Sequence, residues 1–152
     1  MTEPAPDQIR AVIDVNLLVR GVLSATGGSA YLIQLFKQAR FVTVTSRSHL
    51  EELHEVLGYG RLVRRYRISR RQRQRAVVQI YKRSVWVEPV GAVSLCRDPK
   101  DDYLIEMALL SRATHLVSED KDLITDSNIT TFLSQRGTRL VTLQEFLAYL
   151  RR

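Results

Sequence analysis

The segment Arg10-Ala-Val-Ile-Asp-Val-Asn16 constrains the fold more than any other part of the chain. Val12 and Ile13 belong to a short β-branched apolar run, which predicts a strand covered on both faces. An ionised carboxylate at the end of such a strand, here Asp14, is costly unless donors, a cation or a metal compensate its charge. Ligands of open α/β sheets bind beyond the carboxyl ends of the strands. We therefore interpret Asp14 as the first residue of a functional site.

The rest of the chain shows apolar patterns that alternate between strand and helix type. Further strands are expected at 41–44, 85–87, 115–117 and 139–141. Helices are expected at 30–40 after a Ser29 cap, from a capping signature at 48–51 to Gly58, at 62–66, after a Ser69 cap, from 98 to 112, and after a Thr142 cap. This alternation predicts a three-layer α/β/α fold with a central, mostly parallel sheet of about five strands. The length of 152 residues suits one domain, expected at 10–152 after a disordered tail at 1–9.

The composition narrows the class of protein. Cys96 is the single cysteine, so neither an intramolecular disulfide nor a thiolate zinc site is expected. No apolar run approaches the roughly 20 residues of a membrane span, and the polar N-terminus with two prolines is unlike a secretory signal. We therefore expect a cytoplasmic protein that does not contact membranes.

Basic residues are concentrated in one part of the chain. Residues 61–83 contain ten basic side chains and no acid, so the remainder carries −3 of a total net charge of +7. A basic stripe on a mildly acidic body is typical of proteins that bind phosphates. A solvated arginine face and a patch covered by an acidic partner protein are alternatives that the pattern leaves open. The candidate nucleic-acid-binding residues are Arg61, Arg64, Arg65, Arg67, Arg70, Arg71, Arg73 and Arg75.

Helical periodicity selects further acids that could join the first one. In the helix after position 48, Glu52 lies at the edge of the apolar stripe, whereas Glu51 and Glu55 face water. In the helix after Pro99, Asp101 borders the apolar stripe and Asp102 is rotated further out. Glu52 and Asp101 are therefore the better candidates.

Each acid also has a purely structural interpretation. Residues 98–101 form an ordinary helix start, Glu52 alone suits a salt bridge, and Asp120 suits a cap after the strand at 115–117. Four carboxylates at one edge of a sheet, however, would repel one another unless divalent cations neutralised them. Oxygen ligands without Cys or His clusters predict Mg²⁺ or Mn²⁺, which can activate a water for phosphodiester cleavage.

Four segments together resemble the PIN-domain ribonucleases, in particular the VapC-like toxins of bacterial toxin–antitoxin pairs. They are residues 12–16, 50–57, 97–108 and 116–123, and residues 140–147 are similar to the last strand and helix of that family. The resemblance implies a catalytic and metal-binding quartet of Asp14, Glu52, Asp101 and Asp120, with Asn16, Ser118 and Asp122 in support. Asn16 would orient the first carboxylate or a water on the metal, Ser118 stands where the family commonly has threonine, and Asp122 is an auxiliary ligand.

The same resemblance implies the function. The expected protein is a metal-dependent endoribonuclease with RNA as substrate, acting as a homodimeric toxin that a cognate antitoxin protein restrains. Val15 departs from the family, which usually has a hydroxyl residue there, so one hydrogen bond near the first carboxylate is missing. One alternative is a catalytically weak or inactive PIN-like domain that binds RNA or a partner. A second is an aspartyl phosphotransfer protein using Asp14, although Asn16 replaces the second acid of a D-x-D signature.

Overall fold

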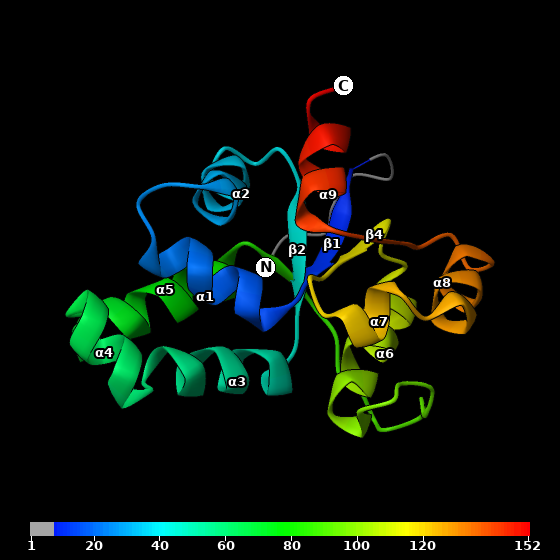
Figure 1. Ribbon diagram of the computed structural model, residues 1–152, viewed down its shortest axis with the longest axis horizontal. Helices are drawn as coiled ribbons and strands as arrows, with labels where there is room; N and C mark the ends of the chain where they lie inside the picture. The colour runs from blue at the N-terminus through cyan, green and yellow to red at the C-terminus, as the bar shows by residue number, and fades with distance from the viewer. Residues whose placement is uncertain (1–7) are drawn as a thin grey trace.

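The computed structural model describes residues 8–152, and its centre is a sheet of five parallel strands (Figure 1). The strands are β1 (Arg10–Ile13), β2 (Val42–Thr45), β3 (Ser84–Trp86), β4 (His115–Val117) and β5 (Arg139–Val141), in the order β3-β2-β1-β4-β5. The predicted sheet is confirmed. The strand order reverses between β1 and β4, and such a switch point at the carboxyl ends is where open α/β sheets bind ligands.

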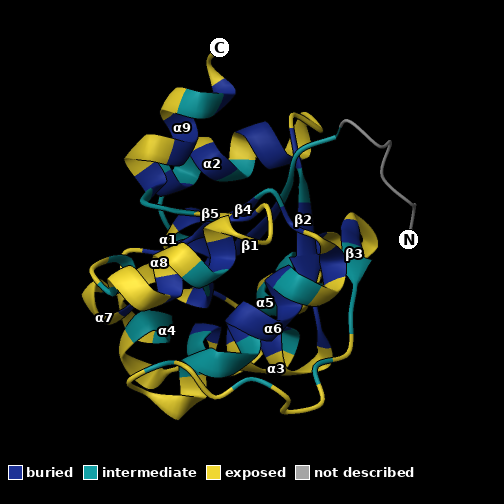
Figure 2. Ribbon diagram, turned by 90° about the vertical axis from the view of Figure 1, so that its right-hand side faces the viewer, coloured by how far each residue is buried: buried dark blue, intermediate teal, exposed yellow. Residues whose placement is uncertain are grey.

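Helices cover both faces of this sheet and complete the three layers. One face carries α1 (Val15–Leu23), α2 (Gly28–Lys37), α3 (Arg47–Leu57), α5 (Arg70–Lys82) and α9 (Leu143–Leu150). The other face carries α6 (Asp102–Ser111), α7 (Lys121–Ile124) and α8 (Ser127–Ser134). Helix α4 (Gly60–Tyr66) lies at the periphery beyond α3. Figure 2 shows burial concentrated in the strands and the inner helix faces, so the core consists of two apolar layers separated by the sheet.

The helix caps agree with the sequence at two places and differ at two others. Ser69 and Thr142 form capping boxes as predicted. The predicted cap at Ser48 is wrong, because the Ser46 hydroxyl accepts from the His49 backbone and starts α3 directly after β2. The predicted Ser29 cap is also wrong, because α2 already begins at Gly28 and the Ser29 side chain is buried.

Three helices were not predicted. Helix α1 follows β1 without a loop, and α7 and α8 are short segments between β4 and β5.

The long connection from β3 to residue 98 is held in place by two acids of α6. The buried Glu106 carboxylate accepts from the backbone N–H groups of residues 90, 91 and 92, at 2.5, 3.0 and 2.9 Å. Asp102 accepts from those of Leu95 and Cys96, at 2.9 and 2.8 Å.

The predicted tail at 1–9 lies largely outside the described residues, which begin at residue 8. Ile9, which the prediction included in that tail, instead packs against the core, and its carbonyl accepts from the Val42 backbone at 2.9 Å. Within residues 8–152, no helix is both long and apolar enough to cross a membrane.

Candidate active site

Asp14 lies directly after the central strand, and its carboxylate receives two donors. The Ser118 hydroxyl donates to Oδ2 at 2.8 Å, and the Asn16 backbone N–H approaches Oδ1 at 3.4 Å as the N-cap contact of α1. The Asp14 backbone N–H donates to the Val117 carbonyl at 3.0 Å, which ties the end of β1 to the end of β4. The fold thus compensates part of the charge that made this acid conspicuous in the sequence.

Asp120 follows β4 and is positioned by the same serine. The Ser118 hydroxyl accepts from the Asp120 backbone N–H at 3.0 Å while donating to Asp14, so one buried hydroxyl links the two acids. The Asp120 carboxylate also accepts from the Asp122 backbone N–H at 2.9 Å, as the N-cap of α7. The structural interpretation of Asp120 as a helix cap is therefore correct, and the cap places its carboxylate beside the end of β1.

Asp101 is the acid whose charge is least compensated. Its neighbour Asp98 caps the 3-10 turn at Pro99–Asp101, whereas Asp101 makes no capping hydrogen bond with its side chain. Burial, followed by the charges of Asp120, Asp14 and Asp98 and a hydrogen bond with Asp120, raises the pKa of Asp101 to about 7. The structure thus brings Asp14, Asp101 and Asp120 together from three separate segments.

Glu52 joins this group through a residue that the sequence did not single out. The Tyr103 hydroxyl donates to Glu52 Oε2, although the glutamate itself remains exposed on α3. The pKa of Tyr103 is raised by burial first, then by its bond to Glu52 and by the charges of Glu52, Asp14 and Asp101. Tyr103 therefore lies among the acids. Its contact with Glu52 spans 51 positions, and no local pattern signals such a contact.

A buried histidine supports the end of β1. The ring of His49 has Nε2 at 2.7 Å from the Ile13 carbonyl and Nδ1 at 3.0 Å from the Thr45 hydroxyl. A carbonyl can only accept, so Nε2 carries the proton and Nδ1 accepts from the hydroxyl. Burial lowers the pKa of His49, against smaller opposing effects of the Ile13 carbonyl and the Asp14 charge. The neutral ring thus joins α3 and β2 to the residue preceding Asp14.

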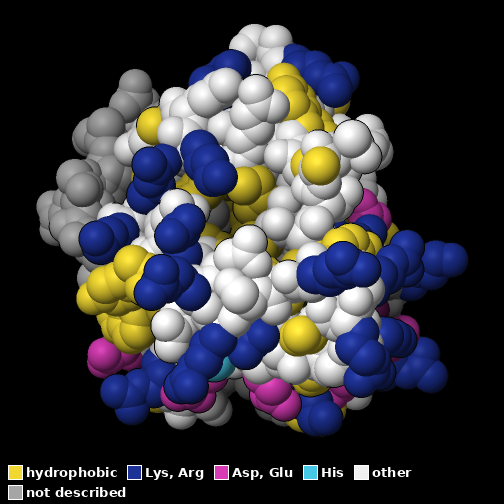
Figure 3. All heavy atoms as spheres, turned by 90° about the vertical axis from the view of Figure 1, so that its left-hand side faces the viewer, with side chains coloured by type: hydrophobic (Ala, Val, Ile, Leu, Met, Phe, Trp, Pro, Cys, Tyr) yellow, Lys and Arg dark blue, Asp and Glu magenta, His cyan; other side chains and the backbone are white. Residues whose placement is uncertain are grey.

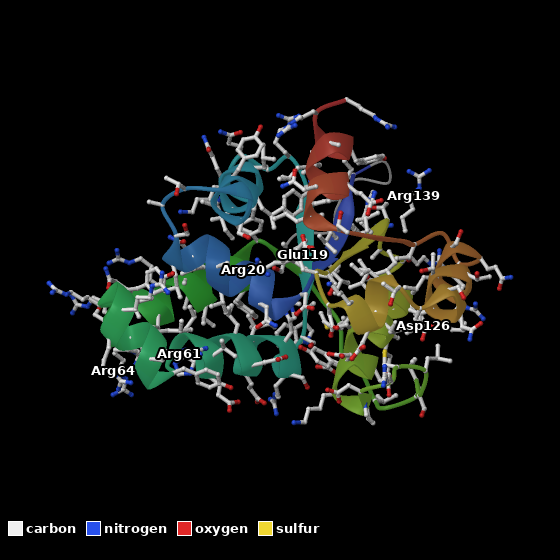
Figure 4. The ribbon with its side chains drawn as sticks, viewed as in Figure 1. Arg20, Arg61, Arg64, Glu119, Asp126 and Arg139 are labelled. Carbon is white, nitrogen blue, oxygen red and sulfur yellow. The ribbon has the colours of Figure 1, made fainter. Side chains whose placement is uncertain are left out.

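A cavity of about 190 Å³ lies beside these acids. It is lined by Asp14, Asn16, Leu17, Arg20, Glu119 and Asp120. The sequence predicted Asn16 at the site, but not Arg20 or Glu119. Arg20 stands four positions after Asn16, on the same face of α1, so helical spacing could have identified it. Figure 4 shows Arg20 on α1 close to Glu119, whose carboxylate accepts from the Leu143 backbone at 3.2 Å.

Two other predicted positions have different surroundings. Val15 is 1% exposed and packs in the core, and it does not line the cavity. The hydroxyl that donates to Asp14 comes from Ser118 instead. The Asp122 carboxylate lies 3.7 Å from the Arg97 guanidinium in an exposed ion pair. The part of Asp122 as an auxiliary ligand stays a prediction.

The predicted arginines lie mainly on the surface of α4 and α5. We call this surface the arginine face, formed by the exposed Arg61, Arg64, Arg65, Arg67, Arg70, Arg71 and Arg75. Arg73 differs, because it is half-buried and its Nε has no hydrogen-bond partner among the described residues. Figure 3 shows basic side chains spread over this side of the molecule with hydrophobic side chains between them, and Figure 4 shows Arg61 and Arg64 on α4.

The donor set determines which ion would suit the site. The four acids offer carboxylate oxygens, the ligands that Mg²⁺ and Mn²⁺ prefer. Within residues 8–152, no three His, Cys, Asp or Glu side chains converge closely enough to hold an ion as they stand. Burial and the charges of Asp120, Asp14 and Asp98 nevertheless raise the pKa of Asp101, and a cation there would favour its ionised form. Donor chemistry and charge therefore fit a hard divalent cation.

Comparison with known proteins gives the family. Residues 10–122 match the PIN domain, whose members are generally nucleases. The chain is also similar to the uncharacterized protein MJ1680 of Methanocaldococcus jannaschii, with 26% identity over 145 residues that cover 92% of this chain and 90% of the relative. No solved structure matches it. Since the PIN-domain match covers most of the chain, from β1 to the start of α7, this protein belongs to the PIN-domain family.

Proposed function

We propose that this protein is a metal-dependent endoribonuclease with Asp14, Glu52, Asp101 and Asp120 as its active site. The observation that carries the proposal is the gathering of three acids from the end of β1, the 3-10 turn and the loop after β4, where burial and the neighbouring acidic charges raise the pKa of Asp101 to about 7. Such a cluster is unfavourable for the isolated fold and favourable for cation binding. Its place at the switch point of a PIN-domain sheet supports a nuclease site.

The proposal assigns a role to each side chain. Asp14, Asp101 and Asp120 would hold Mg²⁺ or Mn²⁺, with Glu52 completing the site directly or through water. The ion, when bound, would activate a water and stabilise the negative charge of the phosphodiester. Ser118 fixes the orientation of Asp14 and the backbone of Asp120.

The substrate would be held by the basic surface of the protein. The arginine face would bind RNA phosphates without reading the base sequence, because phosphate contacts position a nucleic acid and base contacts specify it. In this proposal the reaction takes place in the cytoplasm, where RNA is available.

Cleavage of a defined RNA with Mn²⁺, Mg²⁺ or EDTA tests the assignment. The Asp14→Asn and Asp101→Asn variants should lose metal-dependent cleavage while remaining folded. Asp126→Asn is a matched control, since it makes the same change at the α8 cap and asparagine caps helices as well as aspartate does. Full activity of Asp14→Asn would refute the site. RNA binding without metal-dependent cleavage by the wild type would favour the binding-module alternative, and a covalent phosphate after incubation with an acyl-phosphate donor would favour phosphotransfer.

The biological role is a further part of the proposal, and it rests on the motif resemblance alone. The enzyme would be the toxin of a toxin–antitoxin pair, acting as a homodimer restrained by an antitoxin protein. Expression should then arrest growth for the wild type but not for Asp14→Asn, and sedimentation of the purified protein should give twice the monomer mass. Unimpaired growth with active enzyme in the cell would contradict the toxin role.

A further inference from the structure

Two further cavities lie on the surface beyond the one beside the acids. Arg20 lines both this cavity and a second one of about 330 Å³, which is also lined by Leu23 of α1 and by Leu62 and Tyr66 of α4. Leu23 and Tyr66 in turn line a third cavity of about 410 Å³, which reaches α5. Neighbouring cavities share lining residues, so the three follow one another along the surface. We call this row of cavities the α1–α4 groove; it runs from Asp14 and Asp120, past Arg20, to α5.

The chemistry of this groove changes along its length. At one end lie the acids of the proposed active site. Further along, the charged lining residues are the cations Arg20, Lys37 and Arg75, and the second and third cavities contain no acid. Figure 3 shows the corresponding side of the molecule with basic side chains around hydrophobic ones. Beyond the acidic end, the groove is therefore complementary to a polyanion that also carries apolar surfaces.

Two side chains in the groove are available to such a ligand. The Tyr66 side chain is 40% exposed, and the Arg65 guanidinium lies 5.4 Å from its ring centroid. Arg20 is exposed at the junction of the first two cavities. Within residues 8–152 the ion pair of the structure joins Arg97 and Asp122, so Arg20 forms no ion pair with the carboxylates that share its first cavity. Exposed aromatic rings that stack bases, together with cations that follow the backbone, are typical of single-strand binding.

We propose that the α1–α4 groove binds single-stranded RNA and leads it to the acids. Arg20 binds the phosphate next to the bond to be cleaved, and Tyr66 stacks a base further from the active site. A double helix keeps its bases paired and stacked inside and offers no free base to Tyr66, so the substrate class is single-stranded. The position of the cleaved bond rests on the proposed function, whereas the path of the RNA rests on the groove alone.

The test measures binding separately from cleavage. The full chain carrying Asp14→Asn is titrated in EDTA against a fluorescent single-stranded RNA at several salt concentrations. Adding Arg20→Gln should weaken binding about tenfold and lower the slope of log K against log salt by about 0.7, the value for one phosphate contact with a single strand. Arg139→Gln is the matched control, because Arg139 is an exposed arginine on β5 outside the groove, and it should change neither quantity.

The stacking contact is tested in the same assay. Tyr66→Leu should weaken binding about tenfold, whereas Tyr66→Phe should retain it, because stacking requires the ring and not the hydroxyl. Equal thermal stabilities of the variants verify that the fold is intact, and both side chains are exposed.

Several results would overturn the proposal. They are an unchanged affinity and salt slope for Arg20→Gln, equal binding of a double-stranded RNA of the same length, or competition by an acidic peptide but not by RNA. Because binding is measured without metal and without cleavage, a failure of the nuclease assignment would leave these results readable. Conversely, metal-dependent cleavage with no effect of Arg20→Gln or Tyr66→Leu on binding would refute the groove alone.

Discussion

Replacing Asp101 by asparagine should stabilise the metal-free protein at neutral and alkaline pH. In the fold, the pKa of Asp101 is raised from 3.8 to about 7, chiefly by burial and by the charges of Asp120 and Asp14. The unfolded chain releases this proton near pH 4 and the folded chain retains it to about pH 7. Ionisation therefore favours unfolding, and stability falls as the pH rises through this interval. Asparagine carries no charge at any pH and keeps an amide that can donate to Asp120.

The size of the effect follows from the shift after allowance for solvent. A shift of about three units would correspond to about 4 kcal/mol for a group shielded from water. Asp101 is partly exposed, so screening reduces the expected gain to about 1 kcal/mol. For a chain of 152 residues, with about 2.1 cal/mol/K of unfolding entropy per residue, this gain raises Tm by about 3 °C.

Thermal unfolding in EDTA at about pH 4.5 and pH 8 measures the prediction. The difference in Tm between Asp101→Asn and the wild type should be close to zero at the lower pH and about +3 °C at the higher pH. Asp126→Asn should show no such dependence on pH. The pH-dependent contribution of His49 to Tm is the same in Asp101→Asn and in the wild type, so it cancels in the difference between their Tm values. Equal destabilisation of Asp101→Asn at both pH values would show that the three acids do not share one electrostatic environment.

Three further results are expected. Ser118→Ala should lower RNA cleavage about tenfold and the free energy of unfolding by about 1–2 kcal/mol, because Asp14 loses a buried hydrogen-bond donor. Ser118→Thr keeps the hydroxyl and should retain both activity and stability, so equal losses in the two variants would contradict this role. Glu106→Ala should lower the free energy of unfolding by about 3 kcal/mol or more and accelerate amide hydrogen exchange at residues 90–92, whose backbone N–H groups lose their shared acceptor. Hydrogen exchange at these residues as slow as in the wild type would refute this role of Glu106. Because burial lowers the pKa of His49 below 6.5, the wild type should lose stability as the pH falls below 6.5. His49→Asn should lose less stability over the same pH range in unfolding experiments, and an unchanged pH profile would mean that His49 does not take up a proton on unfolding.

The positions of the main residues of the candidate site could be predicted because they depend on local patterns. Asp14 and Asp120 each follow an apolar strand, and parallel strands bring their carboxyl ends to the same edge of the sheet. Helical periodicity distinguished Asp101 from Asp102, and the structure gives Asp102 a different task in binding the backbone of Leu95 and Cys96. Both inferences need only the direction of a strand or the face of a helix.

The features that escaped prediction depend on packing between distant segments. The Tyr103 contact with Glu52 requires α3 and α6 to meet beyond the end of the sheet, and the sequence of neither helix specifies the other. Ser46 was overlooked as a cap because Ser48, two positions later, gave a similar signal. Arg20 was missed because the apolar segment containing it was not recognised as a helix, so its face could not be assigned.

The order of the strands has a consequence for how the protein is made. The central strand β1 has one neighbour, β2, about 30 residues later in the chain, but its other neighbour, β4, comes about 100 residues later. Synthesis proceeds from the N-terminus, so the arginine face leaves the ribosome before Asp101 and Asp120 do. In the proposed function, a growing chain therefore carries the RNA-binding surface well before its catalytic acids are complete. RNA surrounds the ribosome during synthesis. Until β4 docks beside β1, Asp14 of the growing chain is exposed to that RNA without Asp101 and Asp120 beside it.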